Sequence, residues 1–474
     1  MVGDTVRTRR GALAGVLVTA LVLATGGCVD DRPAAEAGRF RPGAAGLGDP
    51  YLPTSGNGGY DVASYHLKLR YDPGAHLLTG EATIEATATQ NLSRFNLDLT
   101  GLTVSSVRVD DAEAGYRRDG AELVVTPAAG IAEGRRFRVR VDYAGTPTPI
   151  EDSTLGTGGM LQTDDGAIAL GQPESASTWF PVNDHPLDKA TYRIEVTVPD
   201  GLVALSNGVP EGTERSGGWT TWRWSEATPM ASYLTTLVIG RYRVHTGSHA
   251  GRPLVTAVAA TLPVGGAAER SLARTGEIAD FLASRFGPYP FGAYGGIAVA
   301  DDRIDYALET QTRPVYGPAF FTRGPNPAVV VHELAHQWFG NSVSIRHWPD
   351  LWLNEGFATY AEWLWTEHTG GESAQQRFTR EYAATDWSRP AWHPGRSELF
   401  GRAVYTRGAL TVHALRRTVG DDVFFRILRD WTAQRRGGNA DTTEFVAFAE
   451  QASGRSLQSF FAAWLTGRTA PPVP

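Results

Sequence analysis

Apolar and polar residues alternate along the first half of the chain with the period of a β-strand. Residues 65–71, 137–143 and 192–198 show this alternation over whole segments, which predicts strands with one buried face. Turn signals such as Asp72-Pro73-Gly74 separate the strands. We therefore expect residues 60–245 to form an antiparallel β domain of the saddle or sandwich type. Further strands are expected at residues 80–88, 95–99, 219–224 and 233–239.

From residue 246 onward the apolar residues return every three or four positions, which is the helical period. Residues 268–285 predict one amphipathic helix with Leu272, Ile278 and Leu282 near one face. The chain thus reads as an α+β multidomain protein whose second domain, residues 246–470, is mostly helical. The expected elements are helices at 327–339, 353–368, 408–419, 422–435, 442–452 and 457–465, and a short strand at 296–300.

The amino-terminal residues have the pattern of an export signal. Three arginines precede an apolar run at residues 11–24, and small residues then lead to Cys28. The run is short for a membrane-spanning helix, so we expect residues 1–27 to be a signal peptide. Cys28 stands where a bacterial lipoprotein would be cleaved and acylated. Lipidation there would anchor the protein on the outer face of the cytoplasmic membrane; simple secretion is the alternative.

Composition changes this picture little. Residues 28–59 are rich in Pro, Gly, Ala and Ser without periodicity, which predicts a flexible tether. The 474 residues are 42% hydrophobic, enough for large cores, and carry a formal charge of −7. That charge argues against nucleic acid as a partner. A single cysteine excludes an internal disulfide.

The segment His332-Glu333-Leu334-Ala335-His336 carries the strongest chemical signal. Residues four apart lie on one face of a helix, so both imidazoles can bind the same metal. Glu333 is rotated by about 100° and can reach a metal-bound water as a general base. This combination is typical of zinc proteases, although a solvated helix face with two histidines is the alternative.

A third metal ligand is expected at Glu355. It lies nineteen residues after His336, at the start of the next predicted helix and among apolar residues such as Trp352 and Phe357. A carboxylate in such surroundings is usually paired or bound to metal. Two histidines and one carboxylate leave a fourth zinc position open for catalysis.

Residues 332–341, His-Glu-Leu-Ala-His-Gln-Trp-Phe-Gly-Asn, and residues 352–358, Trp-Leu-Asn-Glu-Gly-Phe-Ala, at this spacing resemble the gluzincin aminopeptidases of the M1 type. The resemblance spans residues from about 59 to 468. It implies a short two-domain form of the family with a thermolysin-like catalytic domain and one Zn²⁺ per chain. It also implies removal of amino-terminal residues from peptides by attack of a zinc-bound water.

The resemblance also implies roles for residues outside the zinc motif. Tyr405, in residues 402–409, would donate a hydrogen bond to the oxyanion of the reaction. Ala307 and Glu309 match the substrate-binding motif Gly-Ala-Met-Glu-Asn, in which the glutamate holds the substrate's free amino terminus. Tyr306 replaces the glycine of that motif. Glu174, in a loop at residues 171–184, is the candidate for a second contact to the amino terminus.

Two points remain open from the sequence. Thr359, one turn after Glu355, stands where thermolysin-like enzymes often carry an aspartate, so the acceptor that orients a zinc-bound histidine is expected elsewhere. The short two-domain form and Tyr306 also leave room for a zinc endopeptidase or another small-substrate hydrolase. A surface lipoprotein that binds peptides without cleaving them is the alternative of another class.

Overall fold

The computed structural model describes residues 39–474. The predicted signal peptide, Cys28 and the first part of the predicted tether lie outside these residues. Among the helices of the described residues, none combines the length and the apolar character that a membrane crossing requires.

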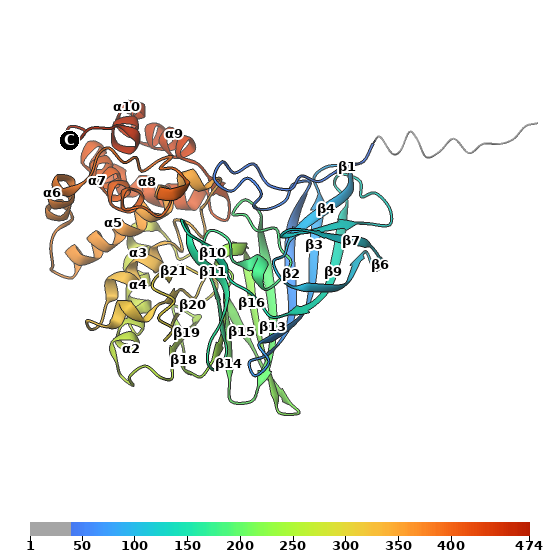
Figure 1. Cartoon of the computed structure of the whole chain (residues 1–474). Helices are drawn as coiled ribbons and strands as arrows, with labels where there is room; N and C mark the ends of the chain where they lie inside the picture. The colour runs from blue at the N-terminus through green and yellow to red at the C-terminus, as the bar shows by residue number, and fades with distance from the viewer. Residues whose placement is uncertain (1–38) are drawn as a thin grey trace, which may run out of the picture. The chain divides into compact units, whose positions relative to one another are not determined.

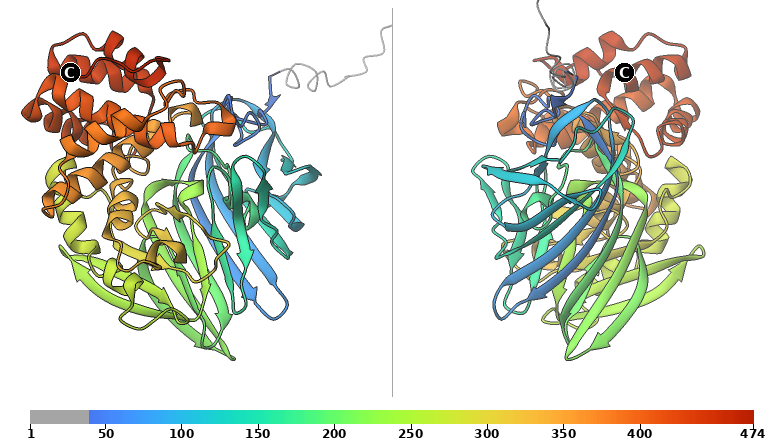
Figure 2. Two further views of the ribbon diagram at one scale, coloured as in Figure 1. Left: turned by 60° about the vertical axis from the view of Figure 1, so that its left-hand side comes forward. Right: turned by 90° about the vertical axis from the view of Figure 1, so that its right-hand side faces the viewer.

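Three β-sheets build the first domain, and Figure 1 shows their strands gathered together in blue and green. The largest sheet has eight strands, and Figure 2 shows its long, curved strands running side by side. Its order is β15 (Val209–Ser216), β16 (Trp219–Ala231), β13 (Lys189–Pro199), β2 (Tyr60–Asp72), β3 (Leu77–Ala88), β9 (Arg136–Gly145), β5 (Thr103–Val109) and β6 (Ala112–Glu113).

Both smaller sheets contribute apolar residues to the main core, and the five-stranded sheet also packs Ile168, Leu205 and Val238 into a second apolar cluster with residues of the second domain. One has four strands, β1 (Arg41–Pro42), β4 (Leu92–Asp98), β8 (Glu122–Thr126) and β7 (Gly115–Asp119). The other has five, β10 (Ile150–Asp152), β11 (Gly156–Gln162), β12 (Ala167–Leu170), β17 (Leu237–Gly240) and β14 (Val203–Ser206).

The predicted alternation sets the register of the large sheet. In β2, Tyr65, Leu67 and Leu69 are buried while the residues between them are more exposed. Leu67 lies opposite Ile194 of β13 in a parallel pair and opposite Ala82 of β3 in an antiparallel pair. A shift of one residue would turn every apolar side chain outward, so burial fixes the pairing.

The second domain combines a smaller sheet with a group of helices, drawn from yellow to red in Figure 1. The sheet contains β18 (Tyr242–His249), β19 (Arg252–Ala259), β20 (Tyr294–Ala298), β22 (Val315–Tyr316) and β21 (Ala307–Leu308). In addition, β23 (Ser344–Ile345) pairs with β24 (Asn439–Ala440).

The helices are α2 (Ala267–Leu272), α3 (Thr275–Phe286), α4 (Pro327–Ala335), α5 (Trp352–His368), α6 (Ala374–Ala384), α7 (Gly408–Val419), α8 (Asp421–Gln434), α9 (Thr442–Ser453) and α10 (Gln458–Phe461). Short helical turns are η1 (Ala176–Thr178), η2 (Ser232–Leu234), η3 (Pro318–Phe321), η4 (Trp348–Asp350), η5 (Arg396–Glu398), η6 (Ala403–Arg407) and η7 (Ala462–Thr466).

Several expected bounds differ from the structure. The helix expected at 327–339 ends at Ala335, because residues 336–338 continue as turns. The helix at 268–285 is broken into α2 and α3, and the Thr275 hydroxyl donates to the Leu272 carbonyl oxygen at the break. The first residues of the strand expected at 233–239 form η2 instead. Strand β18 begins at Tyr242 and pairs with β19 in the sheet of the second domain. The second domain therefore begins a few residues before the predicted boundary at 245.

Residues 40–59 are packed on the protein, so this part of the predicted tether is not flexible. Asp49, Ser55 and Asn57 are each at most 1% exposed. The Ser55 hydroxyl donates to the Asp184 carbonyl oxygen at 2.6 Å, and the Asn57 N–H donates to Asn183 Oδ1 at 2.6 Å. An irregular segment held by hydrogen bonds has no periodicity, so its composition alone resembles that of a flexible linker.

Candidate metal centre and active site

Two helices bring the three predicted metal ligands together. Helix α4 begins with Pro327 after Asn326, whose side chain accepts from the Val329 N–H, and it carries His332. His336 is the residue directly after its last turn. Helix α5 provides Glu355 from its first turn. The two helices pack on each other, so the sequence-distant ligands meet.

The three side chains converge on one point. Glu355 Oε2 lies 3.2 Å from His332 Nε2 and 3.4 Å from His336 Nε2. His336 and Glu355 are buried, with 1% and 3% of their surface exposed. Donor atoms that hold zinc at 2.0–2.2 Å in a tetrahedron lie about 3.4 Å apart. The observed spacing therefore fits a tetrahedral zinc ion.

Each histidine is oriented by an acceptor behind it. His332 Nδ1 lies 2.7 Å from Glu362 Oε1, and His336 Nδ1 lies 3.0 Å from the Phe339 carbonyl oxygen. Both Nδ1 atoms therefore carry the proton, and both Nε2 atoms present a lone pair to the metal. Glu362 was missed from the sequence. It lies two turns after Glu355, a spacing that places it on the same face of α5.

The electrostatics also call for a cation between these groups. Burial alone would lower the pKa of His336, but the charges of Glu355 and Glu309 raise that pKa to about 9. Burial alone would raise the pKa of Glu355, but the two histidines lower it to about 2. The surrounding carboxylates thus favour positive charge at this point, and a divalent cation bound to the neutral imidazoles would supply it, so the residues fit a bound metal.

Glu333 lies beside the ligands and is 5% exposed. One of its carboxylate oxygens lies within 4.8 Å of ligand atoms of Glu309 and His336. Burial raises the pKa of Glu333 to about 8, against the opposing effect of the two histidines. A carboxyl group whose pKa is near neutrality can both accept and return a proton.

Tyr405 faces the same centre from the π-helical turn η6. Its ring stacks on His332 with the ring centroids 6.2 Å apart. Burial and the charges of Glu355, Glu309 and Glu333 raise the pKa of its hydroxyl well above the usual value. The phenol therefore stays protonated and can donate a hydrogen bond.

Glu309 reaches the centre from the end of β21 and is 2% exposed. Its Oε1 accepts from Gln172 Nε2 at 3.3 Å and from the Tyr233 hydroxyl at 3.2 Å. Its backbone carbonyl accepts from the side chains of Gln337 and Asn341, which follow the zinc helix. Burial raises the pKa of Glu309, so its charged form gains from a cationic partner.

The prediction for Glu174 is corrected by the structure. Glu174 lies in a different cavity, close to Asp184, and burial raises its pKa to about 7. The residue of this loop that enters the centre is Gln172, which contacts Glu309. The side chain two positions before Glu174 therefore faces the site.

The residues surround a cavity of about 500 Å³. Its lining includes the metal ligands and the groups around them: His332, Glu333, His336, Glu355, Glu309, Tyr405, Gln172, Ala307, Tyr306, Phe320 and Glu362. Ala307 thus lies where the sequence expected it, and the Tyr306 hydroxyl donates to the Thr157 carbonyl oxygen at 3.4 Å. Helices, a sheet edge and a loop of the first domain together form this cavity.

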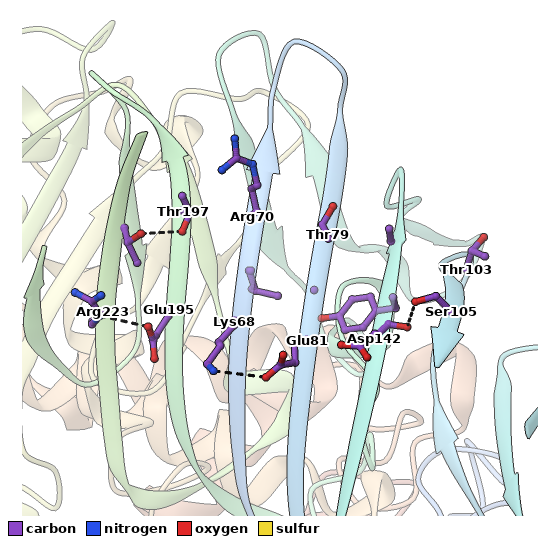
Figure 3. A pocket seen from close by; sticks show the side chains of 15 residues that line it. Lys68, Arg70, Thr79, Glu81, Thr103, Ser105, Asp142, Glu195, Thr197 and Arg223 are labelled. Carbon is purple, nitrogen blue, oxygen red and sulfur yellow. Dashed lines mark hydrogen bonds and ion pairs between the residues drawn. The ribbon is translucent and has the colours of Figure 1, made fainter. Parts of the chain in front are cut away.

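A second cavity of about 540 Å³ lies on the large sheet (Figure 3). Its charges pair with each other: Lys68 Nζ lies 3.5 Å from Glu81 Oε1, and Arg223 Nε lies 3.3 Å from Glu195 Oε2. These side chains form ion pairs between adjacent strands of the sheet. The chemistry is therefore assigned to the cavity at the metal centre.

Comparison with known proteins agrees with this geometry. The family model described as the peptidase M1 N-terminal domain matches residues 62–234, and the model of the peptidase family M1 domain matches residues 322–464. Aminopeptidase N of Streptomyces lividans is 26% identical over 83% of this chain and 52% of its own length. Human glutamyl aminopeptidase is 28% identical over 73% and 38%. The chain thus spans about half the length of the curated relatives it matches, or less.

Solved structures cover nearly the whole fold. An M1 zinc metallopeptidase variant from Deinococcus radiodurans, bound to a Tyr-Ser-Ala substrate, superposes with a TM-score of 0.83. It is 32% identical, and the match covers 90% of this chain and 99% of that one. A two-domain M1 zinc metallopeptidase variant bound to L-tryptophan gives the same values. The chain belongs to peptidase family M1, and its cofactor is one zinc ion.

Proposed function

We propose that the protein is an aminopeptidase that removes single residues from peptides with a free amino terminus. The observation that carries this proposal is Glu309, a carboxylate buried at the cavity beside the metal ligands. Within the described part of the chain, the groups that donate to its Oε1 are neutral: Gln172 and Tyr233. A substrate ammonium group would supply the cation that this buried carboxylate favours.

Glu333 is the general base and acid of the proposed reaction. When bound, the zinc ion polarises a peptide carbonyl and lowers the pKa of water. Glu333 accepts the proton that water loses on attack and returns it to the amine that leaves. Its burial and its near-neutral pKa suit both transfers.

Tyr405 and Glu309 bind two different parts of the substrate. The Tyr405 phenol, which burial keeps protonated, donates to the oxygen that becomes negative during attack. Glu309 fixes the ammonium group and so places the first peptide bond, rather than a later one, beside Glu333. Gln172 holds the Glu309 carboxylate in position.

The relatives support the same activity. Two matched proteins are an aminopeptidase N and a glutamyl aminopeptidase, and a solved structure of similar fold holds a tripeptide substrate. The intact Glu333 and Tyr405 favour catalysis over binding alone, because a binding protein has no need of a general base.

The experiment compares amino-acid arylamides with their N-acetylated forms. We expect the zinc-loaded wild type to cleave the free substrates and to spare the acetylated ones. Glu333→Gln should lose most of the activity, and Glu309→Gln should lose its preference for the free amine. Equal cleavage of both forms would support the endopeptidase alternative. Binding without turnover at full zinc loading would support the peptide-binding lipoprotein.

We also propose that the enzyme works outside the cytoplasmic membrane, on a lipid anchor at Cys28. The export pattern of residues 1–27 and the position of this cysteine support the proposal. Labelled fatty acid should enter the wild type in a bacterial host and not Cys28→Ala. A wild type that takes up no label would leave simple secretion as the explanation, and equal labelling of both chains would place the acylation elsewhere than Cys28.

A further inference from the structure

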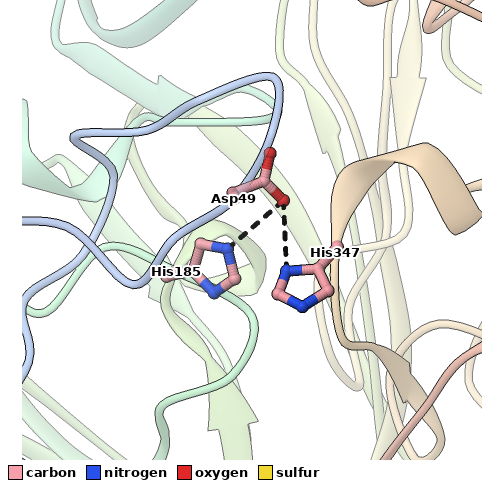
Figure 4. A group of neighbouring side chains, drawn as sticks. All are labelled: Asp49, His185 and His347. Atoms are coloured by element: carbon pink, nitrogen blue, oxygen red, sulfur yellow. Dashed lines mark ion pairs between the residues drawn. The ribbon is translucent and has the colours of Figure 1, made fainter.

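A second cluster of metal-ligating side chains lies apart from the zinc site. Asp49 comes from the ordered amino-terminal segment, His185 from the loop before β13, and His347 from the residue before η4. Figure 4 shows the three side chains converging from separate segments. The segments are far apart in sequence, so only the tertiary fold brings these residues together.

The distances in this cluster suit a metal better than hydrogen bonds. Asp49 Oδ2 lies 3.6 Å from His185 Nε2 and 3.7 Å from His347 Nδ1, and all three ligand atoms lie within 4.8 Å of one another. Hydrogen bonds to a carboxylate are usually below about 3.2 Å. The spacing is instead close to the 3.2 and 3.4 Å found between the ligands of the zinc centre.

Two buried nitrogen atoms of the cluster have no hydrogen-bond partner among residues 39–474. They are His185 Nε2 and His347 Nδ1, and His185 as a whole is 0% exposed. An unpaired polar atom in the interior is costly, and a metal ion placed between the ligands would satisfy both.

Backbone N–H groups hold the Asp49 carboxylate in place as an anionic ligand. Its Oδ1 accepts from the N–H groups of Tyr51 and Leu52, and its Oδ2 accepts from the Trp348 N–H at 2.8 Å. These three backbone N–H donors favour the charged form of the carboxylate and fix its direction toward the two imidazoles.

We propose that Asp49, His185 and His347 form a second metal site, which binds a divalent transition cation of the zinc class. Two imidazoles and one carboxylate select such a cation over calcium or magnesium, which prefer oxygen ligands. The bound ion joins the amino-terminal segment, the first domain and the segment that leads into α5. It is therefore a structural site.

One contact opposes metal binding and limits its strength. His185 Nδ1 accepts from the Leu187 N–H at 3.1 Å, which places the proton of the neutral ring on Nε2. Metal binding at Nε2 moves that proton to Nδ1 and breaks the Leu187 contact. The second site is therefore weaker than the catalytic site, where each Nδ1 already faces an acceptor.

The test counts metal ions on the purified full chain. After dialysis against buffered micromolar Zn²⁺, elemental analysis should give two zinc ions per wild-type chain. His347→Ala should retain one, His336→Ala should retain one, and the double variant should retain none. His245→Ala is the matched control and should retain two, because this exposed histidine pairs with Glu269 outside both clusters. Saturation of the wild type at one ion, or two ions on His347→Ala, would overturn the proposal.

A second measurement separates the site from loose surface binding and from any effect on folding. In His336→Ala, which keeps only the second site, Zn²⁺ should raise the melting temperature and Co²⁺ should give a visible absorption band. Both effects should be absent in the double variant, whose far-ultraviolet circular dichroism should match that of His336→Ala. Equal bands or equal melting shifts in the two variants would contradict the site. The ion counts do not depend on peptidase activity, so failure of the aminopeptidase assay leaves this test intact.

Discussion

The two clusters of two histidines and one carboxylate use the same ligand types at nearly the same spacing, yet their surroundings differ. The cluster at His332 opens into the cavity that Glu333 and Tyr405 also line. The cluster at Asp49 joins three segments that are distant in the sequence. The ligand types set which class of ion can bind at each cluster. The neighbouring acid, base and cavity decide whether the bound ion takes part in a reaction.

The clusters also differ in how their histidines are held. In the first, Glu362 and the Phe339 carbonyl oxygen accept from the two Nδ1 atoms, so the metal-facing lone pairs are set in advance. In the second, the Leu187 N–H holds the other tautomer of His185. The two clusters should therefore respond differently when the groups around them are changed.

Removing the Tyr405 hydroxyl should damage the first cluster most, because it removes chemistry and leaves the ligands in place. Tyr405→Phe should lower kcat by about 100- to 1000-fold, the usual cost of losing one oxyanion donor. Zinc content should be unchanged. Steady-state kinetics with metal analysis of the same sample measures both, and a loss of zinc would show that the residue acts on the site's structure.

Glu362 tests the importance of orienting the metal-bound histidine. Glu362→Gln weakens the acceptor of His332 Nδ1, and loss of such a partner typically costs about 10- to 100-fold in metal affinity. Competition with a zinc chelator should show this loss at the first cluster and no change at the second. A Thr359→Ala control should bind zinc as the wild type does. If both clusters weaken together, the effect is a general loss of structure.

Gln172 tests the edge of the catalytic cavity. Gln172→Ala removes the hydrogen bond to Glu309 Oε1, which should raise KM for free-amine substrates by about 3- to 10-fold. Glu174→Gln, two residues away in another cavity, should leave KM unchanged. A larger effect from Glu174 would restore the register first expected from the sequence.

Glu174 should instead affect stability, in a pH-dependent way. Burial raises its folded pKa to about 7, so the folded state binds its proton more tightly than the unfolded state does. Its contribution to stability is full below the unfolded pKa of 4.5 and is lost as pH rises through 7. Glu174→Gln should therefore gain about 1 to 3 kcal/mol over the wild type at pH 8 and little at pH 4. Urea unfolding at both values measures the gain, and equal gains would disprove the titration.

The smallest effect on catalysis is expected at His347. Its side chain belongs to the structural cluster, so His347→Ala should keep kcat/KM within about twofold of the wild type at 25 °C, an effect below about 0.4 kcal/mol. Arylamide kinetics at saturating zinc is the measurement. A tenfold loss would mean that the second cluster controls the position of Glu355 through η4.

The sequence allowed the centre of the active site to be predicted and left its periphery open. His332, Glu333 and His336 follow from helical periodicity, because local geometry fixes their relative positions. Glu309 and Tyr405 came from the family resemblance. Gln172 could not be placed, because loop length alone does not settle which side chain faces the cavity.

The fold was predictable for similar reasons. Strands such as β2 and β9 repeat apolar residues at the period of their own geometry, so burial could be read from the sequence. The break between α2 and α3 was missed, because the apolar spacing continues across it. The Asp49 cluster was missed as well: its members are 136 or more residues apart and no local pattern connects them.

The packed segment at residues 40–59 has a practical consequence for anyone who shortens this protein for expression. Trimming at residue 59, where composition suggests a dispensable linker, would delete Asp49 and expose the Trp348 N–H that it caps. It would also remove the partners of Asn183 and Asp184 on the first domain. A shortened chain should therefore begin before Arg39, so that the whole packed segment is retained.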